Sequence, residues 1–366
     1  MNPASRRGPQ RAMAAALVVP IALILSGCSR VERDSTDQTA EVADQGPAEV
    51  VNLGYFPNIT HWSALIGVAD GRFEEALGDT RLETHTFNAG PDAVNGLLGD
   101  SLDIQFIGSN PTLSAYEQSD GTHTRLIAGV TSGGAQLVVR PEIASVDDLG
   151  GSTIATPQLA NTQDVAAKKW LFDNDIPQGT GDDEVEVSNV DNAETLALFR
   201  DGQLDGGWLP EPWSSRLVIE ADAEVLVDER DEWPDGRFPT TVIIARTEFL
   251  QAHPETVEAI LRAHVETVLW ARENPEVAKA SANEELERLT GNPLDDEVLD
   301  RAWENIEPTW DPDAGGFPQL AENSVDAGLT DEAPELSAFS DLRPLNRVLT
   351  DLGEEPVDDA GLDDES

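Results

Sequence analysis

The sequence is poor in cysteine, methionine, tyrosine and lysine. Its 366 residues include one cysteine, two methionines and two tyrosines, and its lysines are Lys168, Lys169 and Lys279. Because Cys28 is the lone cysteine, the chain has no internal disulfide, no thiolate metal site and no cysteine nucleophile. The histidines show no metal-ligand spacing, so we expect neither a metal nor another cofactor.

Positive charge is also scarce, and the formal net charge at pH 7 is −47. Such a surface repels phosphate, which excludes nucleic acid as an expected partner. The acidity is typical of a secreted protein in a salty or alkaline medium, where ions screen self-repulsion. The other interpretation is that proteins of this lineage are generally acidic and that this chain has two acidic ends. The composition does not distinguish these two interpretations.

The beginning of the chain has the pattern of an export signal. Arg6, Arg7 and Arg11 precede an apolar run, residues 12–25, that is too short to span a bilayer comfortably. Residues 1–27 are therefore a predicted signal peptide, and Leu25-Ser26-Gly27-Cys28 resembles a bacterial lipobox. The resemblance implies a lipid on Cys28 that anchors the protein at the extracytoplasmic face of the cell membrane. The alternative is a cysteine that ends an ordinary signal.

The remaining chain has polar ends and an alternating middle. Residues 28–48 predict a flexible tether, and the acidic residues 351–366 predict a disordered tail. Between them, strand-like runs such as 50–55 and 102–107 alternate with helical runs such as 63–77. This alternation predicts α/β layers with largely parallel sheets.

The simplest architecture for this pattern has two α/β lobes. We expect the chain to enter the second lobe at Val139–Arg140 and to return at 240–246. Lobe one then comprises residues 49–139 and 240–350, with late helices such as 249–272, and lobe two comprises 140–239. Open α/β sheets bind ligands at the carboxyl ends of their strands, so the cleft between the lobes is the expected site.

Loops rich in amide and hydroxyl groups follow several predicted strands. Asn110 is a good N-cap before Pro111, and Asn161 or Thr162 caps a second helix, while residues 131–134 form a third donor-rich loop. Two helix starts that face each other make an oxyanion receptor without a cationic side chain. The plainer interpretation is that these residues only cap helices.

Larger side chains near these loops allow two interpretations each. Trp208 either packs on a ligand or fills the interface between sheet and helix. Glu211 binds a ligand amine or hydroxyl, caps the following helix, or pairs with Arg216. Asp103 and Asp205 lie at strand starts, away from the expected site, and are interpreted as structural.

The loops occur in a familiar order. Gly54-Tyr55-Phe56-Pro57-Asn58, Asn161-Thr162-Gln163-Asp164 and the block from Glu211 to Leu217 resemble the nitrate/sulfonate/taurine group of ABC-transporter solute-binding proteins, particularly aliphatic-sulfonate-binding members. The resemblance covers residues 50–349. It implies a type II periplasmic-binding-protein fold with a two-stranded hinge, a monomer without enzymatic activity, and delivery of the ligand to a permease and its ATPase. It implies these ligand-binding residues: Phe56, Asn58, His61, Ser109, Asn110, Thr131, Gly133, Gln158, Asn161, Thr162, Gln163, Trp208 and Glu211.

The ligand class stays open at this point. A small organosulfonate or similar oxyanion suits the neutral donors, and nitrate, taurine or a pyrimidine precursor of thiamine are alternatives. An aromatic ring would stack on Trp62, Trp208 or Tyr55. The sequence contains neither a Gly-x-Ser-x-Gly elbow nor a P-loop, which disfavours an enzyme. It lacks repeats and long coiled segments, which disfavours a sensory or adhesive surface protein.

Overall fold

The computed structural model describes residues 43–363, so the predicted signal peptide and Cys28 lie outside the described residues. Eleven strands form two sheets in this part of the chain. The six-stranded sheet has the order β11-β4-β10-β3-β1-β2. Its strands are β1 (Val50–Tyr55), β2 (Arg81–Thr86), β3 (Ile104–Gly108), β4 (Thr124–Gly133), β10 (Pro239–Arg246) and β11 (Ile306–Pro308).

The five-stranded sheet has the order β7-β6-β8-β5-β9. Its strands are β5 (Ala135–Val139), β6 (Thr153–Thr156), β7 (Glu186–Asn189), β8 (Gly206–Pro210) and β9 (Glu224–Asp228). In each sheet three parallel strands adjoin antiparallel strands from the lobe crossings. The predicted two-lobed α/β fold is therefore confirmed.

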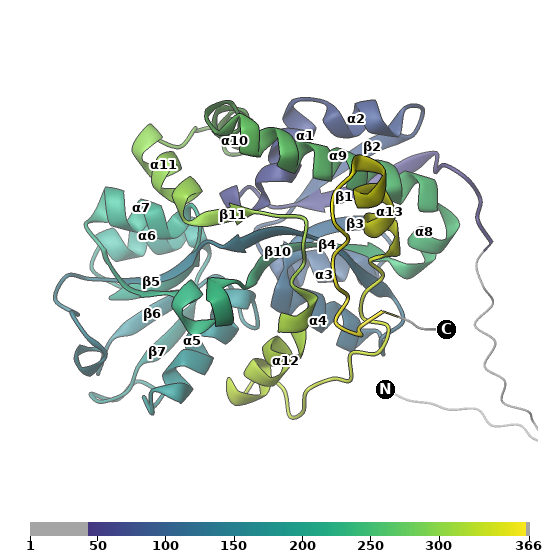
Figure 1. Cartoon of the computed structure of the whole chain (residues 1–366). Coiled ribbons are helices and arrows are strands. Elements are labelled where there is room, and N and C mark those ends of the chain that lie inside the picture. Colours follow the sequence, from purple (N-terminus) through teal and green to yellow (C-terminus); the bar gives the residue numbers. More distant parts are fainter. Residues whose placement is uncertain (1–42, 364–366) are drawn as a thin grey trace, which may run out of the picture. The chain divides into compact units, whose positions relative to one another are not determined.

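Helices cover both faces of each sheet (Figure 1). Lobe two contains α5 (Thr162–Asp173), α6 (Asn192–Arg200) and α7 (Trp213–Ala221). Lobe one contains α1 (Trp62–Ala69), α2 (Arg72–Leu77), α3 (Gly90–Leu98), α4 (Ser109–Gln118), α8 (Thr247–Ala252), α9 (Pro254–Glu273), α10 (Pro275–Thr290), α11 (Asp296–Glu304), α12 (Phe317–Asp326) and α13 (Arg343–Leu352). Short 3-10 turns are η1 (Ile59–His61), η2 (Val146–Asp148), η3 (Glu229–Glu232), η4 (Pro234–Gly236) and η5 (Ala314–Gly316).

The cores follow the two-residue period of the strands. Phe106 and Ile107 are adjacent in β3, yet they belong to hydrophobic clusters on opposite faces of the six-stranded sheet. Trp208 and Leu209 divide in the same way between the two clusters of lobe two. Successive strand side chains point to opposite faces, so strands covered on both sides are apolar throughout.

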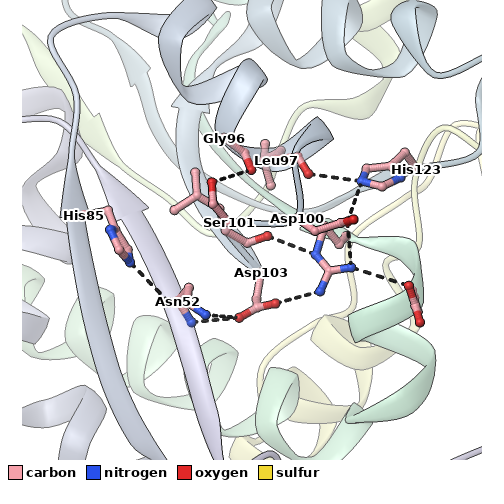
Figure 2. Close-up of polar contacts among 11 residues, drawn as sticks. Asn52, His85, Gly96, Leu97, Asp100, Ser101, Asp103 and His123 are labelled. Carbon is pink, nitrogen blue, oxygen red and sulfur yellow. Dashed lines mark hydrogen bonds and ion pairs between the residues drawn. The ribbon is translucent and has the colours of Figure 1, made fainter.

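Each lobe contains the same aspartate–arginine arrangement at its strand starts. In lobe one, Asp103 Oδ2 accepts hydrogen bonds from Asn52 N and Nδ2, 2.8 and 2.9 Å away, as Figure 2 shows. Arg246 Nη2 donates to Asp103 Oδ1 at 2.9 Å. In lobe two, Asp205 accepts from Thr153 N at 2.9 Å and lies 3.7 Å from Arg140 Nε. Both aspartates hold neighbouring strands together, as their structural interpretation predicts.

The lobe crossing lies earlier than the sequence predicts. β4 passes into β5 at Gly133 and Gly134, whose φ values are +73° and +81°, so residues 135–139 belong to the sheet of lobe two. The return crossing leads through Phe238 into β10. Glycine adopts positive φ without steric cost, which explains why the long strand breaks there and not at Val139–Arg140.

Both ends of the described chain are more ordered than their composition predicts. Ala48 N donates to Thr256 Oγ1 at 2.9 Å, so the last part of the expected tether packs on α9. At the other end, Ser340 N donates to Leu362 O at 3.1 Å and Leu362 is buried beside Phe339. The expectation of a disordered tail is therefore wrong for residues 351–363, because an apolar residue within the acidic run anchors it.

Candidate ligand cavity between the lobes

A small cavity lies where carboxyl ends of strands from both lobes meet. The lining of this neutral cavity contains one histidine, His61, and no lysine, arginine, aspartate or glutamate. The lining residues are Phe56, Asn58, Thr60, His61, Asn88, Ala89, Gly108, Asn161, Thr162, Gln163, Asn192, Pro210, Thr240 and Thr241. Its polar groups are amides, hydroxyls and one imidazole, which donate hydrogen bonds without carrying a full charge.

The two lobes are closed tightly around the neutral cavity. Its volume is about 20 Å³, which holds roughly one water molecule. A Cβ atom added at Gly108 in lobe one would lie 2.5 Å from Thr162 Oγ1 in lobe two. Trp213 Nε1 of lobe two donates to Asn58 Oδ1 of lobe one at 3.0 Å. A ligand larger than water therefore requires the lobes to move apart.

The start of α5 supplies one wall of the neutral cavity. Asn161 is the N-cap, and its Oδ1 accepts from Thr162 N at 2.8 Å. Thr162 is 2% exposed, and its hydroxyl has no hydrogen-bond partner in the described part of the chain. Asn161 O also accepts from Asp164 N and Val165 N, so this wall contributes mainly the partial positive charge of the helix start, which suits an anionic ligand group.

Asp164 fixes the loop that leads into α5. Its carboxylate is buried and accepts from Thr156 Oγ1, Ala160 N and Lys168 Nζ at 2.8, 2.9 and 2.7 Å. The carboxylate is thus fully occupied and is neutralised by Lys168 on the next turn of the helix. The anion-repelling charge in the Asn-Thr-Gln-Asp block is therefore compensated beneath the cavity.

His61 is a neutral donor in the lobe-one wall. Its side chain is buried, and Phe56 N donates to His61 Nδ1 at 3.3 Å. Burial lowers the pKa of His61 to about 3, so the imidazole is uncharged at neutral pH. Because Nδ1 accepts, the ring proton lies on Nε2, which leaves an N–H donor in a residue that lines the cavity.

Six of the predicted site residues line the neutral cavity: Phe56, Asn58, His61, Asn161, Thr162 and Gln163. Ser109 adjoins it, since it follows Gly108, and its fully buried hydroxyl has no partner among the described residues. Gln158 is half-buried in the loop after β6 and does not line the cavity.

Asn110 is placed differently from the prediction. Gly108 is the N-cap of α4, which starts at Ser109, so Asn110 lies inside the first turn. Its Nδ2 donates to Ser324 Oγ of α12 at 3.1 Å. The extended backbone of Gly108, with φ −70° and ψ 156°, provides the cap geometry. Asn110 consequently lines a larger neighbouring cavity, which Thr162 also lines.

Thr131 and Gly133 belong to the hinge strand and not to the cavity wall. Thr131 Oγ1 donates to Thr60 O at 2.6 Å and thereby supports a lining residue from behind. Gly133 pairs with Ile306 of β11. The Thr131 hydroxyl and the Gly133 backbone are therefore engaged within lobe one and do not donate into the neutral cavity.

Glu211 has a structural role. It is fully buried, and its carboxylate accepts from Asn305 Nδ2 at 2.6 Å and from Arg301 Nη1 at 3.3 Å. Ser215 N donates to the other carboxylate oxygen at 3.2 Å. The predicted partner Arg216 instead pairs with Glu220. Glu211 therefore links the start of α7 to α11 and is not free for a ligand.

The aromatic residues proposed for ring stacking are engaged elsewhere. Trp208 is 1% exposed and donates to Glu229 Oε2 at 2.7 Å. Trp62 donates to Val130 O at 3.2 Å, and the Tyr55 hydroxyl donates to Glu285 Oε1 at 2.7 Å. Trp62 and Tyr55 are fully buried in the core of lobe one, which leaves no face for a heterocycle.

Several residues that line the neutral cavity are not predicted from the sequence. Asn192, whose Oδ1 is buried without a partner in the described chain, begins α6 after β7. Its position after a strand end is the same signal that identifies Asn161. Thr240 and Thr241 lie near the start of β10 and line the cavity because the return crossing leads directly into that strand.

Comparison with known proteins identifies the family of this chain. The model of the NMT1-like family matches residues 44–284, about two thirds of the chain. The chain belongs to the NMT1-like family. A taurine-binding periplasmic protein of Escherichia coli (strain K12) is 28% identical over 255 residues, which cover 68% of this chain and 76% of that protein.

Two further relatives of this NMT1-like chain are sulfonate-binding by name. A putative aliphatic sulfonates-binding protein of Bacillus subtilis (strain 168) is 24% identical over 298 residues, covering 80% of this chain and 82% of that protein. The alkanesulfonate-binding protein SsuA from Xanthomonas axonopodis pv. citri, solved bound to MOPS, has a TM-score of 0.64 at 18% identity, covering 79% of this chain and 95% of that chain. The structural match supports the fold of periplasmic binding proteins.

Residues 43–363 offer neither a membrane span nor a metal centre. Within this range no helix is long and apolar enough to cross a bilayer. In the same range no three histidine, cysteine, aspartate or glutamate side chains gather as potential metal ligands.

Proposed function

We propose that this protein is the extracytoplasmic solute-binding component of an ABC importer and captures a small organosulfonate or a similar oxyanion. The observation that carries this proposal is the neutral cavity, where the start of α5 and the unpartnered Thr162 hydroxyl face the opposite lobe. A fixed set of uncharged donors suits an anion that never changes its protonation state. Such donors also cost less to desolvate than a buried lysine.

Closure of the lobes is the binding step in this proposal. The sulfonate head group enters while the lobes are apart, and closure surrounds it with donors from both. The 20 Å³ cavity then corresponds to the ligand-free closed geometry. The two crossings around Gly133 and Phe238 act as the hinge, because they connect the sheets.

Taurine, nitrate and a thiamine-precursor pyrimidine are the alternatives for the same role. The E. coli relative favours taurine among them. The pyrimidine is disfavoured because Trp62 and Tyr55 are buried in the core. We propose a binding role without catalysis, since the relatives compared above are binding proteins.

Calorimetry with the purified protein tests the ligand class. The titrants are propanesulfonate, taurine, nitrate and a hydroxymethylpyrimidine, each at constant ionic strength. We expect saturable binding of a sulfonate with one site per chain. Absence of heat with every sulfonate, together with binding of the pyrimidine, would refute the ligand proposal.

We further propose that Cys28 carries a lipid and that the protein is a monomer that delivers its ligand to a permease and ATPase. Expression of the wild type and Cys28→Ser in a bacterial host tests the anchor. The wild type should remain with the membranes and carry an acyl mass increment, whereas the variant should be released. Equal membrane retention of both would contradict lipidation.

A further inference from the structure

A larger cavity, here called the indole cavity, lies beside the neutral cavity. Its volume is about 520 Å³, within the range of small-molecule sites. It is bounded by α5 on the lobe-two side and by α12 and η5 on the lobe-one side. Helices α5 and α12 pack against each other. Its distinguishing side chains are Trp170, Trp208, Trp233, Glu229, Glu232 and Asp313.

The three indoles are held in place by their neighbours. The Trp170 and Trp208 rings lie 6.0 Å apart between centroids, and Trp208 Nε1 is fixed by its bond to Glu229. Trp233 stacks on Phe238 with an interplanar angle of 21°. Trp208 is 1% exposed and supports Trp170 from behind, so the aromatic surface for alkyl groups and cations comes from Trp170 and the half-buried Trp233.

Three of the carboxylates that line the indole cavity have no ion-pair partner among the described residues, whereas Asp173 is paired with Lys169. Within residues 43–363, no ion pair involves Glu229, Glu232 or Asp313. The two cationic residues of the lining are already engaged, Lys169 by Asp173 and Arg237 by Asp311. Burial raises the pKa of all three carboxyls, to about 8 for Glu229. Glu229 is fully buried, so its carboxylate form is unfavourable unless a cation binds beside it.

A metal ion does not suit this arrangement, because the described residues contain no group of three metal-ligating side chains. An alkylated ammonium does suit it, since its charge attracts the carboxylates and its methyl or methylene groups contact indole faces. Asn110 lines the same cavity and is 4% exposed. Its Oδ1 has no hydrogen-bond partner among residues 43–363 and therefore adds an acceptor.

We propose that the indole cavity binds an alkylated ammonium group. The group belongs either to the far end of the captured solute or to a separate organic cation. Thr162 lines both the indole cavity and the neutral cavity, so one zwitterionic ligand can place its sulfonate at the start of α5 and its ammonium among the indoles. Only this one-ligand case rests on the proposed sulfonate function.

Three probes separate these cases: propanesulfonate, tetramethylammonium, and a sulfobetaine in which a propyl chain joins trimethylammonium to sulfonate. Calorimetry is performed at constant ionic strength, with sodium salt replaced by each probe. We expect the sulfobetaine to bind at least about tenfold more tightly than propanesulfonate, the gain of one desolvated cation–π contact. If the cation is a separate molecule, tetramethylammonium binds alone and the sulfobetaine has no such gain.

Variants identify the site. Glu229→Gln keeps the shape of a buried side chain and an oxygen that accepts from Trp208, and Glu232→Gln alters an exposed side chain that tolerates change. Both should reduce ammonium binding severalfold and leave propanesulfonate binding unchanged. The matched control is Glu224→Gln, an exposed acid of β9 outside the lining, which should change neither.

The possible results are distinguishable. If the sulfobetaine has no advantage and tetramethylammonium gives no saturable heat, the ammonium proposal is overturned. It is also overturned if Glu224→Gln weakens ammonium binding as much as Glu229→Gln, because the attraction would then come from the general negative charge. If tetramethylammonium binds and no sulfonate does, the sulfonate function fails while the ammonium site stands.

Discussion

At the scale of single residues, Thr162 is a position where a substitution should affect ligand affinity and thermal stability differently. Its hydroxyl is buried at the neutral cavity and has no partner among the described residues. A buried hydroxyl without a hydrogen bond destabilises the folded protein by its lost hydration. A sulfonate oxygen bound in the neutral cavity would complete the hydrogen bonding of this hydroxyl.

Thr162→Val should therefore weaken sulfonate binding without lowering thermal stability. Valine has nearly the shape of threonine, so the loss is one hydrogen bond to a charged group, about 1.5–3 kcal/mol or at least roughly tenfold in affinity. The melting temperature should stay the same or rise. Calorimetry and thermal unfolding of the same preparation measure both quantities.

Ser214→Ala is the matched control for this prediction. The Ser214 hydroxyl is equally buried and unpartnered in the described structure, but it lies in α7 outside the neutral cavity. Its removal should affect unfolding as Thr162→Val does and leave the affinity unchanged. An unaltered sulfonate affinity in Thr162→Val would show that this hydroxyl does not contact the ligand.

Glu229 should give stability a characteristic pH dependence. Burial raises the pKa of Glu229 from 4.5 to about 8, so between these values the folded protein holds a proton that the unfolded chain releases. The free energy of unfolding should then fall as pH rises through this window. Glu229→Gln should flatten this decline, measured as melting temperature from pH 5 to pH 8.5.

The comparison of wild type with Glu229→Gln isolates this group from the histidines. Burial lowers the pKa of His61 to about 3 and of His264 to about 4. These residues destabilise the fold as pH falls below 6.5 in both proteins, so their effect cancels in the difference. Parallel melting curves of the two proteins across the window would contradict a raised pKa at Glu229.

At the scale of elements, α11 ties the lobes together through a polar cluster. Arg301 donates to Ser215 Oγ and Gln136 Oε1, both at 2.7 Å, and also reaches Glu211. These partners lie in α7 and β5 of lobe two, whereas α11 also contacts α10 of lobe one. The cluster thus fixes the orientation of β8 and α7 beside the hinge.

Glu211→Ala should destabilise the protein by about 3–5 kcal/mol, the usual result of removing one partner of a buried ion pair. Glu211 is fully buried and Arg301 is 20% exposed, so Arg301 would lose its carboxylate with little water to replace it. Chemical denaturation measures the change. The control is Asp300→Asn in the same helix, which removes an exposed pair with Lys279 and should cost about 1 kcal/mol or less. Similar losses in both variants would argue against a special role for the cluster.

Local sequence patterns predict elements better than their junctions. The strand at 50–55 and the helix after Asn161 match the structure, because hydrophobic period and capping are local properties. The predicted helix at 63–77 is instead α1 and α2, separated at Gly71 with φ +68°.

Contacts between residues far apart in the chain are not predictable from local patterns. The nearest candidate partner of Glu211 was Arg216, whereas its partners Arg301 and Asn305 lie about 90 residues farther along. The indole cavity likewise needs Asp313 and Trp233 brought together by tertiary packing.

At the scale of the whole molecule, the charge opposes the proposed ligand. The net charge is −47, and the neutral cavity offers no cation in compensation. An anion must therefore approach against the field of the entire protein, and its affinity depends on how far that field extends. Salt reduces the Debye length from about 10 Å at 0.1 M to about 3 Å at 1 M.

Sulfonate binding should consequently become tighter as sodium chloride increases between these concentrations. A site built on lysine or arginine would show the opposite trend, because salt would screen its attraction. Calorimetry gives the affinity, and stopped-flow tryptophan fluorescence gives the association rate, which should also rise. Weaker sulfonate binding at high salt would indicate a cationic contact that the neutral cavity lacks.

The position of lobe two in the chain has an evolutionary consequence. The five-stranded sheet is built from residues 135–228, and the chain enters and leaves it through β4 and β10, which are hydrogen-bonded neighbours. An inserted segment whose two ends are adjacent can be exchanged as a cassette, with its Asp205–Arg140 pair included. Recombination at the two crossings would replace one half of the cleft in a single event, while the other half is inherited unchanged.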